Sequence, residues 1–332
     1  MKFRCVPLPL ARGHILGHNV TRDGRRVLKK GRRLGDAELA LIADAGAHSV
    51  HVAELEPGDV EEDAAALRVA RALVASGNLR ERAAYGGRVS LLSASRGVWS
   101  VRSDLLLELN QVEGVTLATL PSHTIVSEGQ TCATLKIIPF ALQEARVARA
   151  EALSLRGLAR VTPLVPRRVC VLVSGAEGRR QTLVDTFRAP LCERLEALGT
   201  TDVEVDFVSL GHEPEAALSS ALEARLAAGA ELVILVSETA TMDADDLAPQ
   251  AIRRAAGEVA VVGAPVFPGN LLLLGYRGAA AIIGAPGCVR SRGRNVVDLI
   301  LPRLLIGERL GAREVAELGL GGLLAGAGEG GE

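Results

Sequence analysis

The sequence predicts an α/β protein whose C-terminal part is a mainly parallel sheet flanked by helices, preceded by a smaller mixed α+β region. Two observations support this prediction. Short apolar runs recur between residues 167 and 309, and a turn and then an amphipathic segment follow each of the first three. The runs are also continuously apolar, as expected of parallel strands that are covered on both faces. Strands that alternate with helices therefore indicate a parallel sheet.

Three strand–helix units follow one another in this part of the chain. The predicted strands lie at 169–174, 203–209 and 232–237. Apolar residues three or four positions apart give the first two helices one apolar face: Leu183, Val184, Phe187, Leu191 and Leu195, then Leu218, Leu222 and Leu226. Pro214 suits a first helical turn, and the third helix is expected to reach about residue 256. Because ligands of such sheets usually lie beyond the carboxyl ends of the strands, the loops after Val173, Val236 and Ile283 form the candidate site.

Four parts of the chain are predicted: an N-terminal β-hairpin and helix region at 1–58, a small mixed α+β domain at 59–160, the α/β domain at 161–317 and a flexible glycine-rich tail at 318–332. In the first part, Asp23-Gly24 is a hairpin signal. A helix follows with Asp36 as its N-cap and Gly46 at its end, before a strand at 49–53.

The second predicted part begins with an alanine-rich helix at 59–76. The first turns of this helix contain four acidic residues, which we interpret as a solvated helix start that complements the helix dipole. These residues are Asp59, Glu61, Glu62 and Asp63. Short β runs between residues 86 and 145, and a helix from Ala141 to Leu155, complete this part.

Composition excludes several classes of function. The formal net charge of -1 gives no global attraction to nucleic acid or to an anionic membrane. The five cysteines form no CxxC pair, which argues against a zinc finger or a disulfide framework, and we expect Cys170 and Cys192 to be buried as small apolar groups. No apolar run approaches the length of a membrane span and no signal-peptide core is seen, so we expect a cytoplasmic protein.

Glycine-rich turns at helix starts are candidates for binding an anion, because free backbone amides and the helix dipole both favour negative charge. The strongest such loops are Gly263–Asn270 and Gly284–Arg290, and the guanidinium groups of Arg290, Arg292 and Arg294 can add contacts to a phosphate. Glycine and proline also mark plain turns, so this alternative stays open. Neither a Walker A sequence nor a GxGxxG motif follows the first strand.

Acidic residues stand at the same predicted edge of the sheet. Asp243, Asp245 and Asp246 follow the third strand, where carboxylates can hold Mg²⁺ or carry protons, and Glu177 follows the first. Equally, one of the three aspartates is expected to cap the next helix. His212 beside Glu213 and Pro214 is read as a solvated turn residue.

With these loops placed, residues 167–309 resemble the molybdopterin-binding proteins of molybdenum-cofactor biosynthesis, a family that includes molybdopterin molybdotransferase. The Ser174–Gly178 turn is similar to the family's Thr-Gly-Asp-Glu-Leu turn, with Ala176 in place of an acid. Ser237 and Asp246 align with a serine and an aspartate, although the family's paired glycines are missing. Phe267–Asn270 and the Gly284, Pro286 and Gly287 turn also match family segments.

The resemblance implies binding of molybdopterin or the finished molybdenum cofactor, with Mg²⁺ as a further expected ion. The residues that it assigns to the cofactor are Ser174, Gly175, Ser237, Pro268, Gly269, Gly284, Pro286, Gly287 and Arg290. Glu177 and Asp246 would be catalytic, and Asp246 would also hold the metal. Three functions stay open: cofactor binding for synthesis, modification or delivery; molybdotransferase activity; and non-catalytic docking of a molybdoenzyme or another maturation protein. The family also implies a homo-oligomer.

Overall fold

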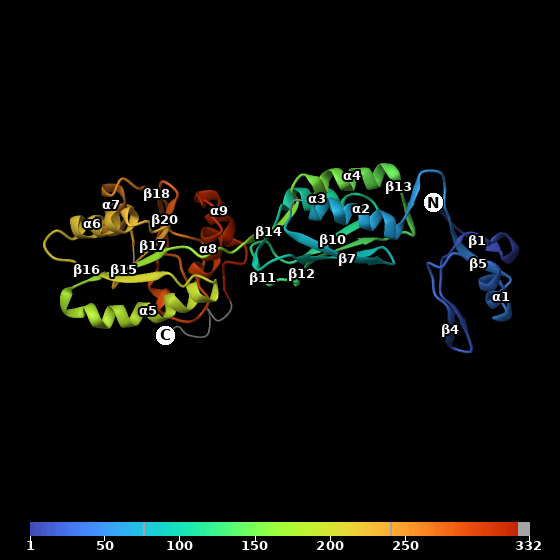
Figure 1. The fold of residues 1–332 in the computed structure, drawn as a ribbon, viewed down its shortest axis with the longest axis horizontal. Coiled ribbons are helices and arrows are strands. Elements are labelled where there is room, and N and C mark those ends of the chain that lie inside the picture. The colour runs from blue at the N-terminus through green and yellow to red at the C-terminus, as the bar shows by residue number, and fades with distance from the viewer. Residues whose placement is uncertain (76, 240, 325–332) are drawn as a thin grey trace. The chain divides into compact units, whose positions relative to one another are not determined.

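A six-stranded sheet organises the C-terminal part of the computed structural model (Figure 1). Its strands stand in the order β16 (Val203–Ser209), β15 (Val169–Gly175), β17 (Leu232–Ser237), β20 (Ala280–Gly284), β19 (Leu273–Arg277) and β18 (Glu258–Val262). The first four run parallel; α5 (Arg180–Ala197) and α6 (Pro214–Ala227) form the crossovers between β15, β16 and β17, and α7 (Leu247–Arg254), β18 and β19 lie between β17 and β20 along the chain. The last two pair antiparallel, so the sheet is mixed rather than parallel throughout.

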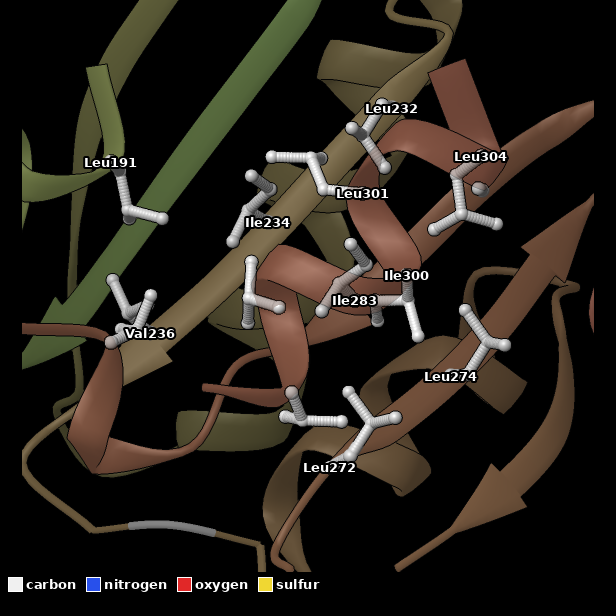
Figure 2. Packing of buried hydrophobic residues seen from close by; sticks show 14 of the residues in the cluster. Leu191, Leu232, Ile234, Val236, Leu272, Leu274, Ile283, Ile300, Leu301 and Leu304 are labelled. Carbon is white, nitrogen blue, oxygen red and sulfur yellow. The ribbon is translucent and has the colours of Figure 1, made fainter. Parts of the chain in front are cut away.

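Helices cover both faces of this sheet. On one face lie α5 and α8 (Val296–Leu305), packed against Val171, Ile234 and Ile283. On the other lie α6 and α7, packed against Leu172, Val233 and Ile282. Figure 2 shows the first face, where Leu301 and Ile300 of α8 approach Ile234 and Ile283. Because successive strand residues point to opposite faces, β15, β17 and β20 each supply both cores, which explains their continuous apolar runs.

The antiparallel hairpin β18–β19 is the main departure from the predicted sheet. Gly263–Asn270, predicted as a ligand loop, lies in the connection between these two strands. Gly263 adopts a φ of +86° there, in the left-handed region that favours glycine. The segment therefore joins two antiparallel strands that are not predicted from the sequence, and its role as a ligand loop stays a prediction.

The structure describes residues 1–75, 77–239 and 241–324, so Ser76, Ala240 and residues 325–332 of the predicted helix, acidic segment and tail lie outside it. The chain divides into two units, Met1–Thr162 and Pro163–Glu332. A further division at residue 58 stays a prediction. Short elements complete the second unit: η2 (Glu177–Arg179), η3 (Gly287–Arg290), α9 (Ala312–Ala316) and η4 (Glu317–Gly319).

The described start of the predicted tail packs against the second unit through two leucines. Leu324 is buried in the core of the second unit, and Leu318 packs against the same core. The amide of Phe267 donates to the carbonyl of Gly322 at 2.8 Å, and the amide of Leu324 donates to the carbonyl of Phe267 at 2.9 Å. Leu318 and Leu324 therefore find apolar partners in the second unit, and the flexibility expected of the tail stays a prediction.

The first unit contains several small sheets. Near its start lie β1 (Lys2–Pro7), β5 (Ser49–Glu54) and β2 (Ile15–Leu16), the hairpin β3 (Val20–Arg22) and β4 (Arg25–Leu28), η1 (Leu8–Leu10) and α1 (Asp36–Asp44). The larger sheet contains β10 (Val115–Thr119), β12 (Thr131–Ile137), β8 (Arg88–Ser93) and β7 (Leu79–Tyr85). Shorter pairings join β11 (Ile125–Val126), β9 (Gly97–Val101) and β14 (Ala159–Pro163), and β13 (Ala141–Gln143) with β6 (Asp59–Glu61).

Helices α2 (Glu62–Val74), α3 (Ser103–Asn110) and α4 (Glu144–Leu155) contribute to the core of the larger sheet, around Trp99. The hairpin predicted at Asp23-Gly24 is confirmed, since both residues have positive φ between β3 and β4. The predicted starts of three helices, α1, α2 and α4, are wrong. Gly35, not Asp36, is the N-cap of α1. Residues 59–61 and 141–143 pair as strands, and the helices begin after them.

Strand pairing also changes the interpretation of the predicted acidic helix start. The side chain of Asp59 is only 1% exposed, and Oδ2 accepts from the amide of Glu56 at 2.8 Å. Glu62, the first residue of α2, pairs with Lys136 at 3.0 Å. The group is therefore partly a buried, hydrogen-bonded cluster rather than a solvated surface.

Cysteines differ in their exposure. Cys132 and Cys170 are buried, Cys192 and Cys288 are half-buried, and Cys5 is exposed. Burial raises the pKa of the Cys170 thiol to about 12 and also raises the pKa of Cys132, Cys192 and Cys288. The prediction of a buried Cys170 is confirmed, whereas Cys192 is buried only in part. Across the described ranges, no helix combines the length and the apolar character that a membrane crossing requires.

Candidate functional site

A pocket opens at the carboxyl ends of three neighbouring strands, β15, β17 and β20. The pocket is open to solvent, and the space between its walls, with the solvent at its mouth included, is about 440 Å³. The residues that line it come from the strand ends, the following loops and the starts of two helices: Ser174, Leu218, Leu235, Val236, Ser237, Thr239, Thr241, Asp246, Leu247, Ala248, Gly284 and Ala285. Four residues that the sequence assigned to the cofactor or the metal thus stand around one pocket: Ser174, Ser237, Asp246 and Gly284.

Hydroxyl groups give this pocket its polar character. Ser174 is 4% exposed, and its Oγ donates to the carbonyl of Val236 at 3.4 Å. The Oγ of Ser237 donates to the carbonyl of Thr239. Thr239 and Thr241 add two further hydroxyls, and neither is predicted as a site residue from the sequence. Because each hydroxyl both donates and accepts, the lining suits a ligand that presents mixed hydrogen-bonding groups.

Asp246 is on the pocket wall and is also the N-cap of α7. Its Oδ1 accepts from the amide of Leu247 at 2.9 Å, and its Oδ2 accepts from the amide of Met242 at 3.0 Å. Each carboxylate oxygen therefore has a backbone partner, which fixes the loop before α7. Its predicted catalytic role stays a prediction.

Glu177 stands apart from the residues that line the pocket. It opens η2 and pairs through both oxygens with the guanidinium of Arg180, at 2.7 and 3.0 Å. Hydrogen bonds from Arg180 lower the pKa of the Glu177 carboxyl. The Arg180 guanidinium also lies over the ring of Phe207, 4.5 Å from its centroid. A catalytic role for Glu177 would thus require this exposed pair to open.

Two glycines at the ends of β15 and β20, Gly175 and Gly284, allow close packing of neighbouring side chains. A Cβ at Gly175 would collide with Cδ1 of Leu183, and one at Gly284 would lie 2.7 Å from Cβ of Leu273. Neither position tolerates a side chain unless a neighbour moves. These two of the four glycines assigned to the cofactor therefore have a packing role whether or not a ligand contacts them.

Pro268 and Gly269 approach the start of α8. The carbonyl of Pro268 accepts from the amide of Val296 at 3.1 Å, and Gly269 has a φ of +131°. A Cβ at Gly269 would lie 2.5 Å from Cβ of Val296. These two residues therefore support α8, and neither is among the residues that line the pocket.

The loop that continues from the pocket wall runs from Pro286 to Arg294, and we refer to it as the arginine loop. Pro286 is buried and stands before η3, and Gly287 is half-buried. Arg290 is exposed, and its Nε donates back to the carbonyl of Gly287 at 2.9 Å. Arg292 pairs with Glu193 of α5, with its Nε 2.8 Å from a carboxylate oxygen. Arg294 is exposed and has no hydrogen bond or ion pair to any other residue in the described ranges.

The remaining acidic candidates do not converge on a metal. Asp243 accepts from the amide of Asp245 at 2.8 Å, and Asp245 lies 3.7 Å from Arg253. In the portion of the chain that the structure describes, no three His, Cys, Asp or Glu side chains are grouped to hold a metal ion. The metal-binding role of Asp246 therefore stays a prediction, in which one carboxylate would hold Mg²⁺ together with waters or ligand oxygens. His212 is exposed in the turn before α6.

No family model and no curated protein matches the chain. Among solved structures, the molybdopterin biosynthesis protein MoeA from Pyrococcus horikosii is similar at 13% identity, with a TM-score of 0.31 over 94% of this chain and 76% of that one. A molybdenum cofactor biosynthesis protein from Pyrococcus furiosus is similar at 11% identity, with a TM-score of 0.24 over 95% of this chain and 65% of that one.

Proposed function

We propose that this protein binds a phosphorylated pterin, either molybdopterin or the finished molybdenum cofactor, at the carboxyl edge of the second unit's sheet, and serves the synthesis, modification or delivery of that cofactor. One observation carries the proposal. Residues matched to the molybdopterin-binding pattern from three separate strands, Ser174, Ser237 and Gly284, line one pocket. They are far apart in the sequence, and only the parallel arrangement of β15, β17 and β20 brings them together.

The chemistry of the lining supports a pterin. A pterin is a planar heterocycle whose edge both donates and accepts hydrogen bonds, as the hydroxyls of Ser237, Thr239 and Thr241 do. Apolar side chains, including Leu218 and Leu247, line the same pocket and suit the faces of a flat ring. Binding rather than turnover is proposed, because Asp246 caps a helix and Glu177 pairs with Arg180.

Purification from a cofactor-producing host tests the proposal directly. After oxidation of the purified protein, pterin fluorescence should be recovered in proportion to the protein. A titration with molybdopterin, its adenylylated form and the finished cofactor then identifies the bound form. Absence of pterin from the purified protein, together with no saturable binding of any of the three, would contradict the proposal.

Two variants locate the binding in the pocket. Ser237→Ala and Thr239→Val each remove one hydroxyl from the lining, and each should weaken pterin binding by about three- to tenfold, the loss expected for one hydrogen bond. Ser219→Ala is the matched control, because Ser219 is a buried serine of α6 that is not among the lining residues. Equal binding by all three variants and the unaltered protein would place the ligand elsewhere.

A further inference from the structure

Arg194 of α5 is an unusual arginine because its side chain is only 10% exposed and every N–H group of its guanidinium is used. Nε donates to Oδ1 of Asp298 at 2.9 Å. Nη1 donates to the carbonyls of Pro190 at 3.0 Å and Val289 at 3.2 Å. Nη2 donates to the carbonyls of Ser291 at 2.8 Å and Gly293 at 2.9 Å.

The three loop carbonyls that accept from Arg194 belong to alternate residues, Val289, Ser291 and Gly293. The residues between and after them are Arg290, Arg292 and Arg294, and all three are exposed. One buried guanidinium therefore holds the inner side of the arginine loop, while its arginines lie at the surface.

The same guanidinium joins the loop to the start of α8. Oδ2 of Asp298, its ionic partner, accepts from the amide of Asn295 at 2.8 Å. Asn295, 1% exposed, caps α8 and donates to the carbonyl of Gly293 at 3.2 Å. Arg194 thus fixes the loop against two helices at once, and five fixed donors make this geometry specific to arginine.

Among the loop arginines, Arg290 and Arg294 have guanidinium N–H groups that are available to bind a ligand. Arg292 is neutralised by Glu193. Arg290 uses only Nε in a hydrogen bond to its own loop, which leaves its two NH₂ groups for a ligand. The loop follows Gly284 and Ala285 of the pocket wall directly along the chain, so these cations belong to the same edge of the sheet.

We propose that Arg194 is a positioning residue that holds the arginine loop so that Arg290 and Arg294 bind the phosphate of the pterin ligand. This inference rests on the proposed function and assigns the charged end of the ligand to the loop. The phosphate is dianionic near neutral pH, so two guanidinium groups match its charge and its acceptor geometry.

The test compares two fluorescent oxidised pterins, one that carries the terminal phosphate and one from which it has been removed. The unaltered protein should bind the phosphorylated form at least about tenfold more tightly, because charge-assisted hydrogen bonds contribute more than neutral ones. Arg194→Lys, Arg290→Gln and Arg294→Gln should each reduce this preference and leave the affinity for the dephosphorylated form unchanged. The two loop variants alter only exposed side chains, so their folding is not at risk.

Two controls separate positioning from general stability. Arg303→Lys alters another buried arginine of the same unit, 3% exposed and paired with Glu308, and should preserve the preference for phosphate. Arg292→Gln removes the loop arginine that Glu193 neutralises and should also preserve it. Limited trypsin digestion with mass spectrometry provides a ligand-free readout, because Arg194→Lys should speed cleavage after Arg290, Arg292 and Arg294 and Arg303→Lys should not.

Each outcome is decisive. If the unaltered protein binds neither pterin, the proposed function is overturned and the inference with it. If it binds both pterins equally, the proposed function stands and the inference is overturned. If Arg194→Lys speeds cleavage of the loop but retains the full preference for phosphate, Arg194 is not a positioning residue for the ligand.

Discussion

Asp246 fits two interpretations of the sequence, as a catalytic carboxylate and as a helix cap. Asp246→Ala should lower the free energy of unfolding by about 1 kcal/mol, because the amides of Leu247 and Met242 would lose their acceptor. Asp246→Asn should retain part of that stability, since the single side-chain oxygen of asparagine can still accept from the amide of Leu247 but not also from that of Met242. Urea denaturation measures both changes.

The same pair of variants separates a structural role from a catalytic one. Asn keeps the cap but removes the charge, so a carboxylate that takes part in molybdate insertion would be inactive as Asn although the protein stays folded. If Asp246→Ala were as stable as the unaltered chain, the hydrogen bonds of this cap would contribute nothing measurable.

At the scale of single residues, the sequence located part of the pocket but not its supports. Ser174, Ser237 and Gly284 could be predicted because each stands at the end of a recognisable strand. Arg194 could not, because it lies in the middle of a helix and its loop partners are 95 to 99 residues away along the chain. Hydrogen bonds to backbone carbonyls leave no pattern in the identities of the residues that accept them.

Helix α8 should contribute strongly to the stability of the second unit. Leu301→Ala should lower the free energy of unfolding by about 2–5 kcal/mol, because Leu301 is 1% exposed in the core beside Ile234 (Figure 2). Leu320→Ala is the matched control: Leu320 is 97% exposed, so the same substitution should change stability by less than about 0.5 kcal/mol. Similar losses at both positions would contradict the packing of α8 on the sheet.

The starts of β15 and β17 are joined by an ion pair whose strength depends on pH. Glu231 accepts from Nη1 of Arg167 at 2.5 Å and from the amide of Arg168 at 3.1 Å. The hydrogen bond from Arg167 lowers the pKa of the Glu231 carboxyl below its ordinary value of 4.5. A lowered pKa in the folded state means that the stabilisation is complete above the unfolded pKa and is lost as the pH falls through the folded one.

Glu231→Gln should therefore lower the free energy of unfolding only at pH values at which the Glu231 carboxylate is charged. The difference in unfolding free energy between the unaltered protein and this variant should be constant from about pH 6 to 8 and shrink as the pH falls below about 4.5. Chemical denaturation at a series of pH values measures it. A difference that grows on acidification would show that the pair does not stabilise the fold.

At the scale of elements, the sequence was most informative where a strand leaves a clear apolar pattern. The strands at 203–209 and 232–237 have the predicted bounds, because the first alternates apolar with polar residues and the second is a continuous buried run. The hairpin β18–β19 was missed because its connection is rich in glycine and proline, a pattern that binding loops share. Strands β6 and β13 were assigned to the helices that follow them, since three-residue strands are too short to show an alternation.

For the whole molecule, the two units should unfold as separate cooperative transitions, because each has its own hydrophobic core. Trp99, the single tryptophan of the chain, is fully buried in the first unit, so its fluorescence reports that unit alone. In urea, the fluorescence transition of the full chain should coincide with that of a fragment of residues 1–162. Far-UV circular dichroism should show an additional transition, which a fragment of residues 163–332 reproduces.

One transition seen identically by both probes, with neither fragment folded by itself, would contradict this prediction. The boundary predicted near residue 160 rested on a proline-rich connector, whereas the finer division at residue 58 rested on a change in pattern alone. Sequence patterns mark boundaries best where proline prevents regular structure, and they are weak where one set of short strands gives way to another.

The unequal shielding of the cysteines makes the protein convenient for spectroscopy. Thiol-directed dyes react with the thiolate, and burial disfavours that form at Cys132, Cys170, Cys192 and Cys288. Cys5 on β1 is the exposed exception. A maleimide fluorophore should therefore attach first at this single position in the natural sequence, which would provide an emission donor or acceptor for distance measurements without any engineered substitution.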